Sequence, residues 1–308
     1  MSTPADQNLV VGLDIGGTRI KCGIYNVATQ EVLSSDVAPT PREETAFFTT
    51  ISDLVSKQAA QVGQPHAVGV SIGSYVFADG SIDGMSSFVP FLTHGYPLGA
   101  KISECLNLPA RVDNDARLIA LAEAVSGVGA PYHRVLVLTL GTGIGVGLVE
   151  DKRPVGADSS MHLAGHILVR AGNEFACLDS EPCYCGQTGC FESTCSGTSL
   201  AKLVHDKLEE NATNEVLFQR AQAGDKQAQE IVQWYISMLC RALNSYVYIY
   251  CPDAIVLAGG VAHALGPWIE HIQKALVAEV YEGQHTDVLL TTLKEDSGII
   301  GAASLFAS

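Results

Sequence analysis

One pattern occurs twice in this sequence: an apolar strand runs into a glycine turn, and a second strand returns at once. The two copies occupy residues 9–26 and 135–149, with the turns Gly16-Gly17-Thr18 and Gly141-Thr142-Gly143. A unit that recurs in this way indicates a duplicated domain. Helical and strand periodicities alternate along the rest of the chain, which predicts an α/β architecture.

The length of the chain agrees with a duplication. At about 150 residues per domain, 308 residues correspond to two domains. We expect an N-terminal domain over residues 1–117 and a C-terminal domain over residues 118–295. The last helix, at about residues 296–308, is expected to pack back onto the first domain.

The charge and the apolar pattern exclude several function classes. The formal net charge of −15 opposes binding to nucleic acid and to anionic lipid. No stretch approaches the roughly 20 apolar residues that a membrane helix needs. The polar, acidic start of the chain lacks the pattern of a signal peptide, so we expect a soluble, cytoplasmic protein with reduced thiols. Since the first strand is predicted to begin at about residue 9, we expect no DNA-binding domain before it.

The first glycine turn lies within Asp14–Lys21, which reads DIGGTRIK. Glycines after a strand let backbone N–H groups approach phosphate oxygens without a Cβ in the way. Asp14 could hold Mg²⁺ through water, and Thr18 could donate its hydroxyl. The plain alternative is a hairpin turn, for which Gly-Gly is common.

A second and a third glycine element strengthen the phosphate interpretation. The segment 140–148 reads LGTGIGVGL, and a buried strand ends in Gly259-Gly260. Two glycine loops can grip a polyphosphate, and the third would let an adenine ring pack against bare backbone. Its alternative is a helix N-terminus packed tightly on the sheet.

A carboxylate suited to proton transfer follows another strand. Asp113-Asn114-Asp115 stands between that strand and the helix predicted over residues 115–126. A phosphoryl acceptor needs a carboxylate that orients its hydroxyl and takes the proton. Asp115 could do this, although spacing alone favours a role as the N-cap of the helix.

These motifs together resemble the ROK family, which comprises repressors, uncharacterised reading frames and sugar kinases. The similarity runs from Val10 to about Ser304. It implies the two-domain actin-like ATPase fold with ATP and sugar in the cleft, a homodimer, and Asp115 as the catalytic base. The residues that it assigns to the nucleotide are Asp14, Gly16, Gly17, Thr18, Lys21, Gly141, Thr142, Gly143, Gly259 and Gly260.

The resemblance also covers a cysteine-rich segment. Residues 183–192 read CYCGQTGCFE, which is similar to the zinc motif of the family. The implied zinc segment runs over residues 166–190. The implied ligands are His166, Cys183, Cys185 and Cys190. Three thiolates and one imidazole form a closed, structural site. Cys177 and Cys195 would be bystanders, and Asn114, His166 and Glu192 are implied to contact the sugar.

The sequence departs from the family pattern on the sugar side. Family kinases usually read AGExGH before the zinc histidine, whereas this chain reads MHLAGH over residues 161–166, so that Leu163 replaces a sugar-binding glutamate. Phe88 lies where the family often has Pro-Asn-Leu, and Arg117 replaces an asparagine. A site that loses a hydrogen-bond acceptor changes its specificity.

We therefore expect an ATP-dependent kinase that phosphorylates a hydroxyl of a hexose or hexose derivative, with ATP, Mg²⁺ and structural Zn²⁺. The alternative is a non-catalytic protein that senses a sugar or nucleotide and acts through a protein partner.

Overall fold

The structure is a computed structural model that describes residues 8–84, 89–169, 182–208 and 212–307. It forms two compact units. The first unit consists of Met1–Pro131, Gly147–His162 and Thr292–Ser308, and the second consists of Tyr132–Val146 and Leu163–Thr291. The boundary expected at residue 117 falls inside helix α3 (Asp115–Ser126), the whole of which belongs to the first unit.

The first unit contains a five-stranded sheet in the order β3-β2-β1-β4-β5. Its strands are β1 (Leu9–Ile15), β2 (Arg19–Asn26), β3 (Glu31–Pro39), β4 (Ala67–Ile72) and β5 (Ala110–Asn114). The first three form an antiparallel meander, whereas β4 and β5 run parallel to β1. The carboxyl ends of β1, β4 and β5 therefore lie at one edge of the sheet.

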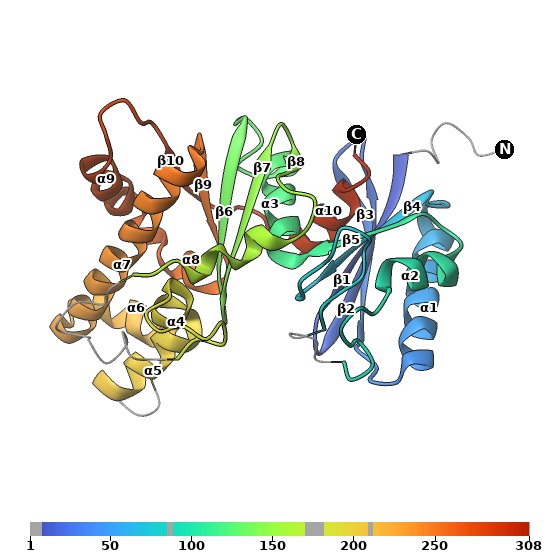
Figure 1. Cartoon of the computed structure of the whole chain (residues 1–308), viewed down its shortest axis with the longest axis horizontal. Coiled ribbons are helices and arrows are strands. Elements are labelled where there is room, and N and C mark those ends of the chain that lie inside the picture. The colour runs from blue at the N-terminus through green and yellow to red at the C-terminus, as the bar shows by residue number, and fades with distance from the viewer. Residues whose placement is uncertain (1–7, 85–88, 170–181, 209–211, 308) are drawn as a thin grey trace. The chain divides into compact units, whose positions relative to one another are not determined.

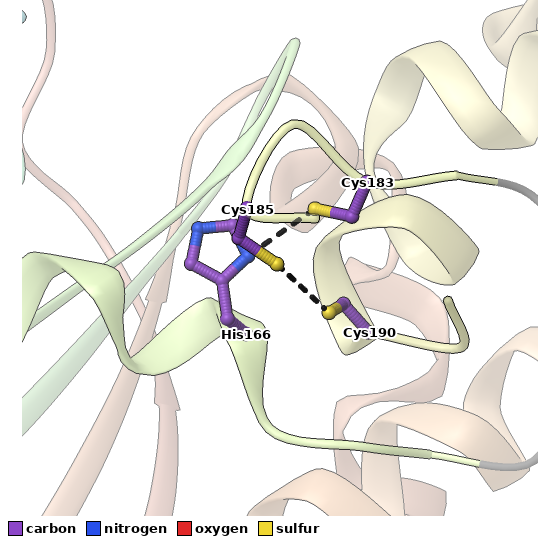
Figure 2. Close-up of side chains that lie close together, drawn as sticks. All are labelled: His166, Cys183, Cys185 and Cys190. Atoms are coloured by element: carbon purple, nitrogen blue, oxygen red, sulfur yellow. Dashed lines mark hydrogen bonds between the residues drawn. The ribbon is translucent and has the colours of Figure 1, made fainter. Parts of the chain in front are cut away.

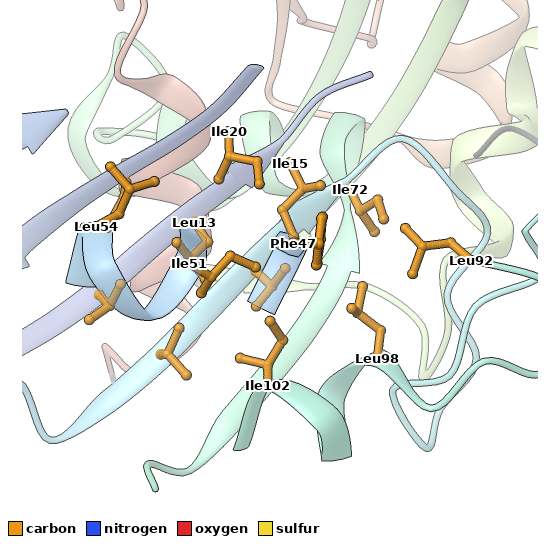
Figure 3. Packing of buried hydrophobic residues seen from close by; sticks show 14 of the residues in the cluster. Leu13, Ile15, Ile20, Phe47, Ile51, Leu54, Ile72, Leu92, Leu98 and Ile102 are labelled. Carbon is orange, nitrogen blue, oxygen red and sulfur yellow. The ribbon is translucent and has the colours of Figure 1, made fainter. Parts of the chain in front are cut away.

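Helices cover both faces of this sheet (Figure 1). On one face, α1 (Glu44–Val62) and α2 (Leu98–Leu106) pack their apolar stripes on the strands. Figure 3 shows Phe47 and Ile51 of α1 and Ile102 of α2 directed at side chains of the sheet such as Leu13, all fully buried. This cluster forms the core on this face of the sheet. The predicted bounds of α3 are confirmed by the structure.

The C-terminal helix α10 (Ser297–Ser304) packs on the opposite face, beside α3. Glycines allow this close approach: a Cβ at Gly69 would overlap the carbonyl oxygen of Ala302, and one at Gly301 would overlap the carbonyl oxygen of Leu118. The helix is thus fixed on β4 and α3 by contacts between backbones.

The second sheet has the order β10-β9-β6-β7-β8. Its strands are β6 (Arg134–Leu140), β7 (Ile144–Glu150), β8 (Arg153–Pro154), β9 (Ala254–Ala258) and β10 (Asp287–Leu290). From β8 to β10 this order matches the first sheet from β3 to β5, with β9 and β10 parallel to β6. The repeated topology agrees with the duplication read from the two glycine turns.

The second unit is rich in helices. They are η2 (Ser160–His166, of which the last four residues belong to this unit), α4 (Phe191–Cys195), α5 (Gly197–Lys207), α6 (Asn214–Gln222), α7 (Lys226–Tyr250), α8 (Gly260–Ala264), η4 (Gly266–Trp268) and α9 (Ile269–Glu279). The longest, α7, starts where the Asp225 side chain accepts hydrogen bonds from the amides of Gln227 and Ala228, and ends at Cys251 in a left-handed conformation. Among the described residues, no helix combines the length and the apolar character needed to span a bilayer.

Candidate active site

The first glycine turn joins β1 to β2 in the first unit. The Gly16 amide donates to the Arg19 carbonyl at 2.9 Å, which closes the turn and leaves the side chain of Thr18 exposed. Asp14 lies one residue before the end of β1, and its Oδ1 accepts from the Ser71 hydroxyl at 2.9 Å. Burial raises the pKa of Asp14, although Ser71 and the nearby Lys21 oppose this rise.

Lys21 is the register partner of Asp14 on the neighbouring strand. Its Nζ donates to the Glu295 carbonyl at 3.0 Å and lies 3.3 Å from Glu295 Oε2. The ammonium group therefore already has partners beside the turn.

The Asp113-Asn114-Asp115 turn connects β5 to α3, and the cap of the helix is Asn114. Its Oδ1 accepts from the amides of Ala116 and Arg117 at 3.0 and 3.4 Å, and its Nδ2 donates to the Ser74 carbonyl at 3.1 Å. The interpretation of Asp115 as the N-cap is therefore wrong. Asp115 is the first helical residue.

The carboxylate of Asp115 lies beside Gly73, where an added Cβ would be 3.3 Å from Oδ2. Its Oδ1 accepts from the Ala116 amide at 2.8 Å. Burial raises the pKa of Asp115, and the negative charge of Asp14 raises it further, while the Ala116 amide opposes both. A carboxylate with a raised pKa is a better proton acceptor than an ordinary aspartate. The sequence motif thus places a basic carboxylate at the carboxyl edge of the first sheet.

Arg117 has a structural role that the sequence did not reveal. Its Nε donates to both carboxylate oxygens of Asp113, at 2.9 and 3.0 Å. Its two terminal nitrogens donate to the carbonyls of Val155 and Gly156, at 2.6 and 3.2 Å. The guanidinium group, buried with Asp113, ties the Asp113-Asn114-Asp115 turn to the segment that follows β8. We call this set of four contacts the arginine clasp.

A cavity of about 1080 Å³ lies in the second unit and brings together two of the predicted glycine elements. Gly141 and Thr142 line it together with Gly260 at the start of α8. Gly143 and Gly259 are not among the lining residues. Gly259 has a φ of 94° and packs so closely that a Cβ would lie 2.5 Å from the Leu140 carbonyl oxygen.

The same cavity is walled by Gly197 and Thr198, which the sequence did not single out. The Gly197 amide donates to the Gly141 carbonyl at 2.7 Å, and the Thr198 hydroxyl donates to the Thr142 carbonyl at 2.8 Å. The start of α5 therefore fixes the second glycine turn. Phe218 and several charged side chains of α5 and α6 complete the wall.

The cysteine-rich segment and His166 form a compact cluster, in which the four side chains point toward one another (Figure 2). All four ligand atoms lie within 4.8 Å of one another. Cys183 Sγ is 3.3 Å from His166 Nδ1, and Cys185 Sγ is 3.5 Å from Cys190 Sγ. In a tetrahedral site with Zn–S bonds of about 2.3 Å the sulfurs lie about 3.8 Å apart. The residues present therefore fit a zinc ion.

The other ring nitrogen of His166 faces a polar site. Its Nε2 lies 2.9 Å from the hydroxyl of Tyr184 and 3.9 Å from Glu192 Oε2. Burial raises the pKa of Glu192 to about 7, although the Ile144 amide opposes this rise. The carboxylate also approaches the second glycine turn, since a Cβ at Gly143 would be 3.1 Å from Oε1.

Two buried tyrosines of α7 hold this region in place. The Tyr246 hydroxyl donates to the Ala164 carbonyl at 2.7 Å, next to the Gly165-His166 pair, and the Tyr235 hydroxyl donates to the Cys195 carbonyl at 3.0 Å. Both residues lie on the apolar stripe of α7 and resemble core residues in the sequence. A usable signal was present, because a buried tyrosine hydroxyl needs a hydrogen-bond partner.

The structure describes some of the residues at which the sequence departs from the family pattern, and one of the two cysteines predicted to be bystanders. Leu163 lies in η2 with 37% of its surface exposed, and Arg117 forms the clasp. Cys195 is fully buried at the end of α4. Phe88 and Cys177 lie outside the described residues.

Two sheets with the same strand order, helices on both faces of the first, and glycine turns after equivalent strands define a two-domain α/β protein of the actin-like ATPase fold. The chain belongs to the ROK family, whose sequence model matches residues 10–308. It is 33% identical over 301 residues to the N-acetylgalactosamine kinase AgaK of Shewanella sp. (strain ANA-3), and the alignment covers 96% of this chain and 95% of that protein.

Solved structures show the same fold. The ROK hexokinase from Thermus thermophilus superposes with a TM-score of 0.84 at 27% identity, covering 96% of this chain and 97% of that chain. The ROK family glucokinase from Streptomyces griseus, solved in complex with glucose and AMPPNP, superposes with a TM-score of 0.75 at 26% identity, covering 96% of this chain and 98% of that chain. The predicted family and fold class are thereby confirmed.

Proposed function

We propose that this protein is an ATP-dependent sugar kinase that phosphorylates a hydroxyl of a hexose or hexose derivative, with Asp115 as the base. The observation that carries the proposal is the Asp115 carboxylate. It is freed from capping by Asn114, lies beside Gly73, and has a pKa raised by burial. The kinase names of the relatives above support the same reaction class.

In the proposed reaction, Asp115 accepts the proton of the sugar hydroxyl while the oxygen of that hydroxyl forms a bond to the γ-phosphorus of ATP. The bond from that phosphorus to the bridging oxygen breaks, and ADP leaves with the electron pair. Such transfer depends mainly on positioning and on charge neutralisation. Asp115, held at the first position of α3, would orient the hydroxyl for this step.

The nucleotide would use the glycine elements. The cavity lined by Gly141, Thr142 and Gly260 would receive the nucleoside side of ATP. Backbone N–H groups of the first turn, with Thr18, would meet phosphate oxygens. Asp14 would hold Mg²⁺, which supplies charge neutralisation when bound.

The sugar would contact His166 and Glu192, which lie together on the side of the cysteine cluster that faces away from the sulfurs. We propose that the cluster holds a structural Zn²⁺, because a closed set of three thiolates and one imidazole leaves no open position for substrate. The zinc would fix the orientation of His166. Asn114 could donate only its second amide hydrogen to the sugar, since the cap and Ser74 engage its other groups.

The test is ATP consumption by the purified protein with a panel of sugars: glucose, mannose, fructose, N-acetylglucosamine and N-acetylgalactosamine. We expect at least one sugar to be phosphorylated with a kcat above about 1 s⁻¹, within the usual range of enzymes. If a sugar changes the thermal stability of the protein but none of the panel is phosphorylated, the proposal is wrong and the sensor alternative gains support.

A further inference from the structure

His162 stands one residue before Leu163, in the first turn of η2. Its Nδ1 lies 2.5 Å from the carbonyl oxygen of Ser159. Because a carbonyl oxygen only accepts, Nδ1 must carry the hydrogen in this contact. The neutral ring therefore presents the lone pair of Nε2. Among the described residues, none forms a hydrogen bond with this nitrogen.

The ring is held from two sides within the first unit. The Val76 amide donates to the Ser159 hydroxyl oxygen at 2.7 Å, and the Ser159 amide donates to the Val76 carbonyl at 3.1 Å. These two bonds fix Ser159, whose carbonyl oxygen selects the tautomer of His162. The Tyr75 ring packs edge-on against His162 with the centroids 5.8 Å apart. The tautomer and the orientation of His162 are thus determined before any ligand binds.

His162 also lies close to the Asp113-Asn114-Asp115 turn, because Tyr75, which packs on its ring, follows Ser74, whose carbonyl accepts a hydrogen bond from Asn114. The charge of a protonated His162 would oppose the rise in pKa of both Asp113 and Asp115. Asp113 is already neutralised by Arg117. The imidazole therefore belongs to the surroundings of the proposed base and adds a hydrogen-bond acceptor there.

In the sequence, this hydrogen-bond acceptor stands next to the position where the family has a sugar-binding glutamate and this chain has Leu163. Where the family pattern reads Gly-Glu, this chain reads His162-Leu163. The carboxylate that would accept from sugar hydroxyls is absent, and an imidazole that accepts one hydrogen bond stands one position earlier. A carboxylate can accept several hydrogen bonds, whereas Nε2 can accept only one.

We propose that His162 Nε2 accepts a hydrogen bond from a sugar hydroxyl adjacent to the one that Asp115 deprotonates, and that it thereby determines the specificity for the acceptor. This inference rests on the proposed sugar kinase function. The expected substrate class is a hexose derivative that presents a single hydroxyl donor at this position, with a deoxy or substituted carbon beside it.

The test compares the wild-type protein with His162→Phe, which keeps an aromatic ring against Tyr75, and His162→Gln, which restores an acceptor oxygen. The probe is the panel sugar with the highest kcat/KM, together with its monodeoxy analogues. Unpaired buried polar groups cost about 1–3 kcal/mol, which is about ten- to a hundredfold in KM. We expect His162→Phe to raise the KM for the sugar by this factor, with kcat and the KM for ATP almost unchanged. His162→Gln should recover part of the loss.

The analogues identify the partner of Nε2. One monodeoxy sugar should be a poorer substrate than the parent sugar for the wild-type protein, yet equal to the parent sugar for His162→Phe. An unchanged sugar KM in His162→Phe would overturn the inference while leaving the kinase function intact. A lower kcat with the same KM for every sugar would also overturn it, in favour of an effect on the basicity of Asp115. If the wild-type protein phosphorylates no sugar, the proposed function fails, and this inference fails with it.

Discussion

Replacing Arg117 by methionine should destabilise the first unit strongly, because the arginine clasp is buried. Only 4% of the Arg117 side chain and 11% of the Asp113 side chain are exposed. Methionine fills a similar volume but offers no donor. Asp113 would lose its counter-charge, and the carbonyls of Val155 and Gly156 would lose their donors. Removing one partner of a buried ion pair costs about 3–5 kcal/mol. For a unit of this size the loss corresponds to a fall in Tm on the order of 10 °C.

The stability lost by Arg117→Met should depend on pH in a direction that the structure predicts. Burial raises the pKa of Asp113 in the folded protein, and Arg117 opposes this rise. The stability linked to a carboxyl with a raised pKa is fully present below its unfolded pKa, and it is lost as the pH rises through the folded pKa. Without Arg117 the folded pKa would rise further. The loss of stability in Arg117→Met, relative to the wild-type protein, should therefore be largest at neutral pH. This loss should shrink toward about pH 4.

The assay is thermal unfolding followed by circular dichroism between pH 4 and pH 8. Arg220→Met is the matched control, because the Arg220–Asp225 pair has the same chemistry with 36% and 26% of the side chains exposed. A pair with this much access to solvent contributes at most about 1 kcal/mol. If Arg117→Met melts within 2 °C of the control at pH 7, or if its deficit grows on acidification, the clasp does not stabilise the unit as argued.

Two other substitutions test the remaining parts of the site. Cys190→Ser should lower the zinc content measured by plasma mass spectrometry together with the Tm, since metal binding and folding are linked, whereas the exposed Cys251→Ser should change neither. Equal zinc in both variants would contradict the ligand set. Gly197→Ala would place a Cβ 2.6 Å from the Gly141 carbonyl oxygen and should raise the KM for ATP about tenfold or more, whereas Gly266→Ala meets only an ordinary contact and should leave that KM unchanged. If the two alanine variants have the same KM for ATP, the contact of α5 with the second glycine turn does not shape the nucleotide site.

Local motifs allowed the sequence to point to much of the candidate site. The glycine turns, the Asp115 helix start and the cysteine segment each consist of residues close in the chain, and their spacing reflects backbone geometry. The family match confirms the classification that they support. The strand β3 (Glu31–Pro39) was missed, because its residues are exposed or half-buried and its apolar residues Val32, Leu33 and Val37 do not alternate regularly with polar ones. Helix α9 (Ile269–Glu279) was missed for a related reason, since only Ile272 and Leu276 are buried.

The contacts that position the site join residues far apart in the sequence. The clasp joins Arg117 to residues 38 and 39 positions away, and Tyr246 reaches a carbonyl 82 positions away. No periodicity or local spacing encodes such pairs. Arg117 was recognised as a departure from the family pattern and His162 was not, and the partners of both residues became apparent only in the folded chain.

The most direct test of the central claim is the turnover of Asp115→Asn with the sugar and ATP. Asparagine keeps the size of the side chain and leaves the Asn114 cap in place, so folding and ATP binding should be preserved. The account predicts that kcat falls by about a hundredfold or more, the usual effect of losing a general base, while the KM for ATP stays near the wild-type value. Turnover of the same sugar at the wild-type rate by Asp115→Asn would contradict the claim that this carboxylate accepts the proton.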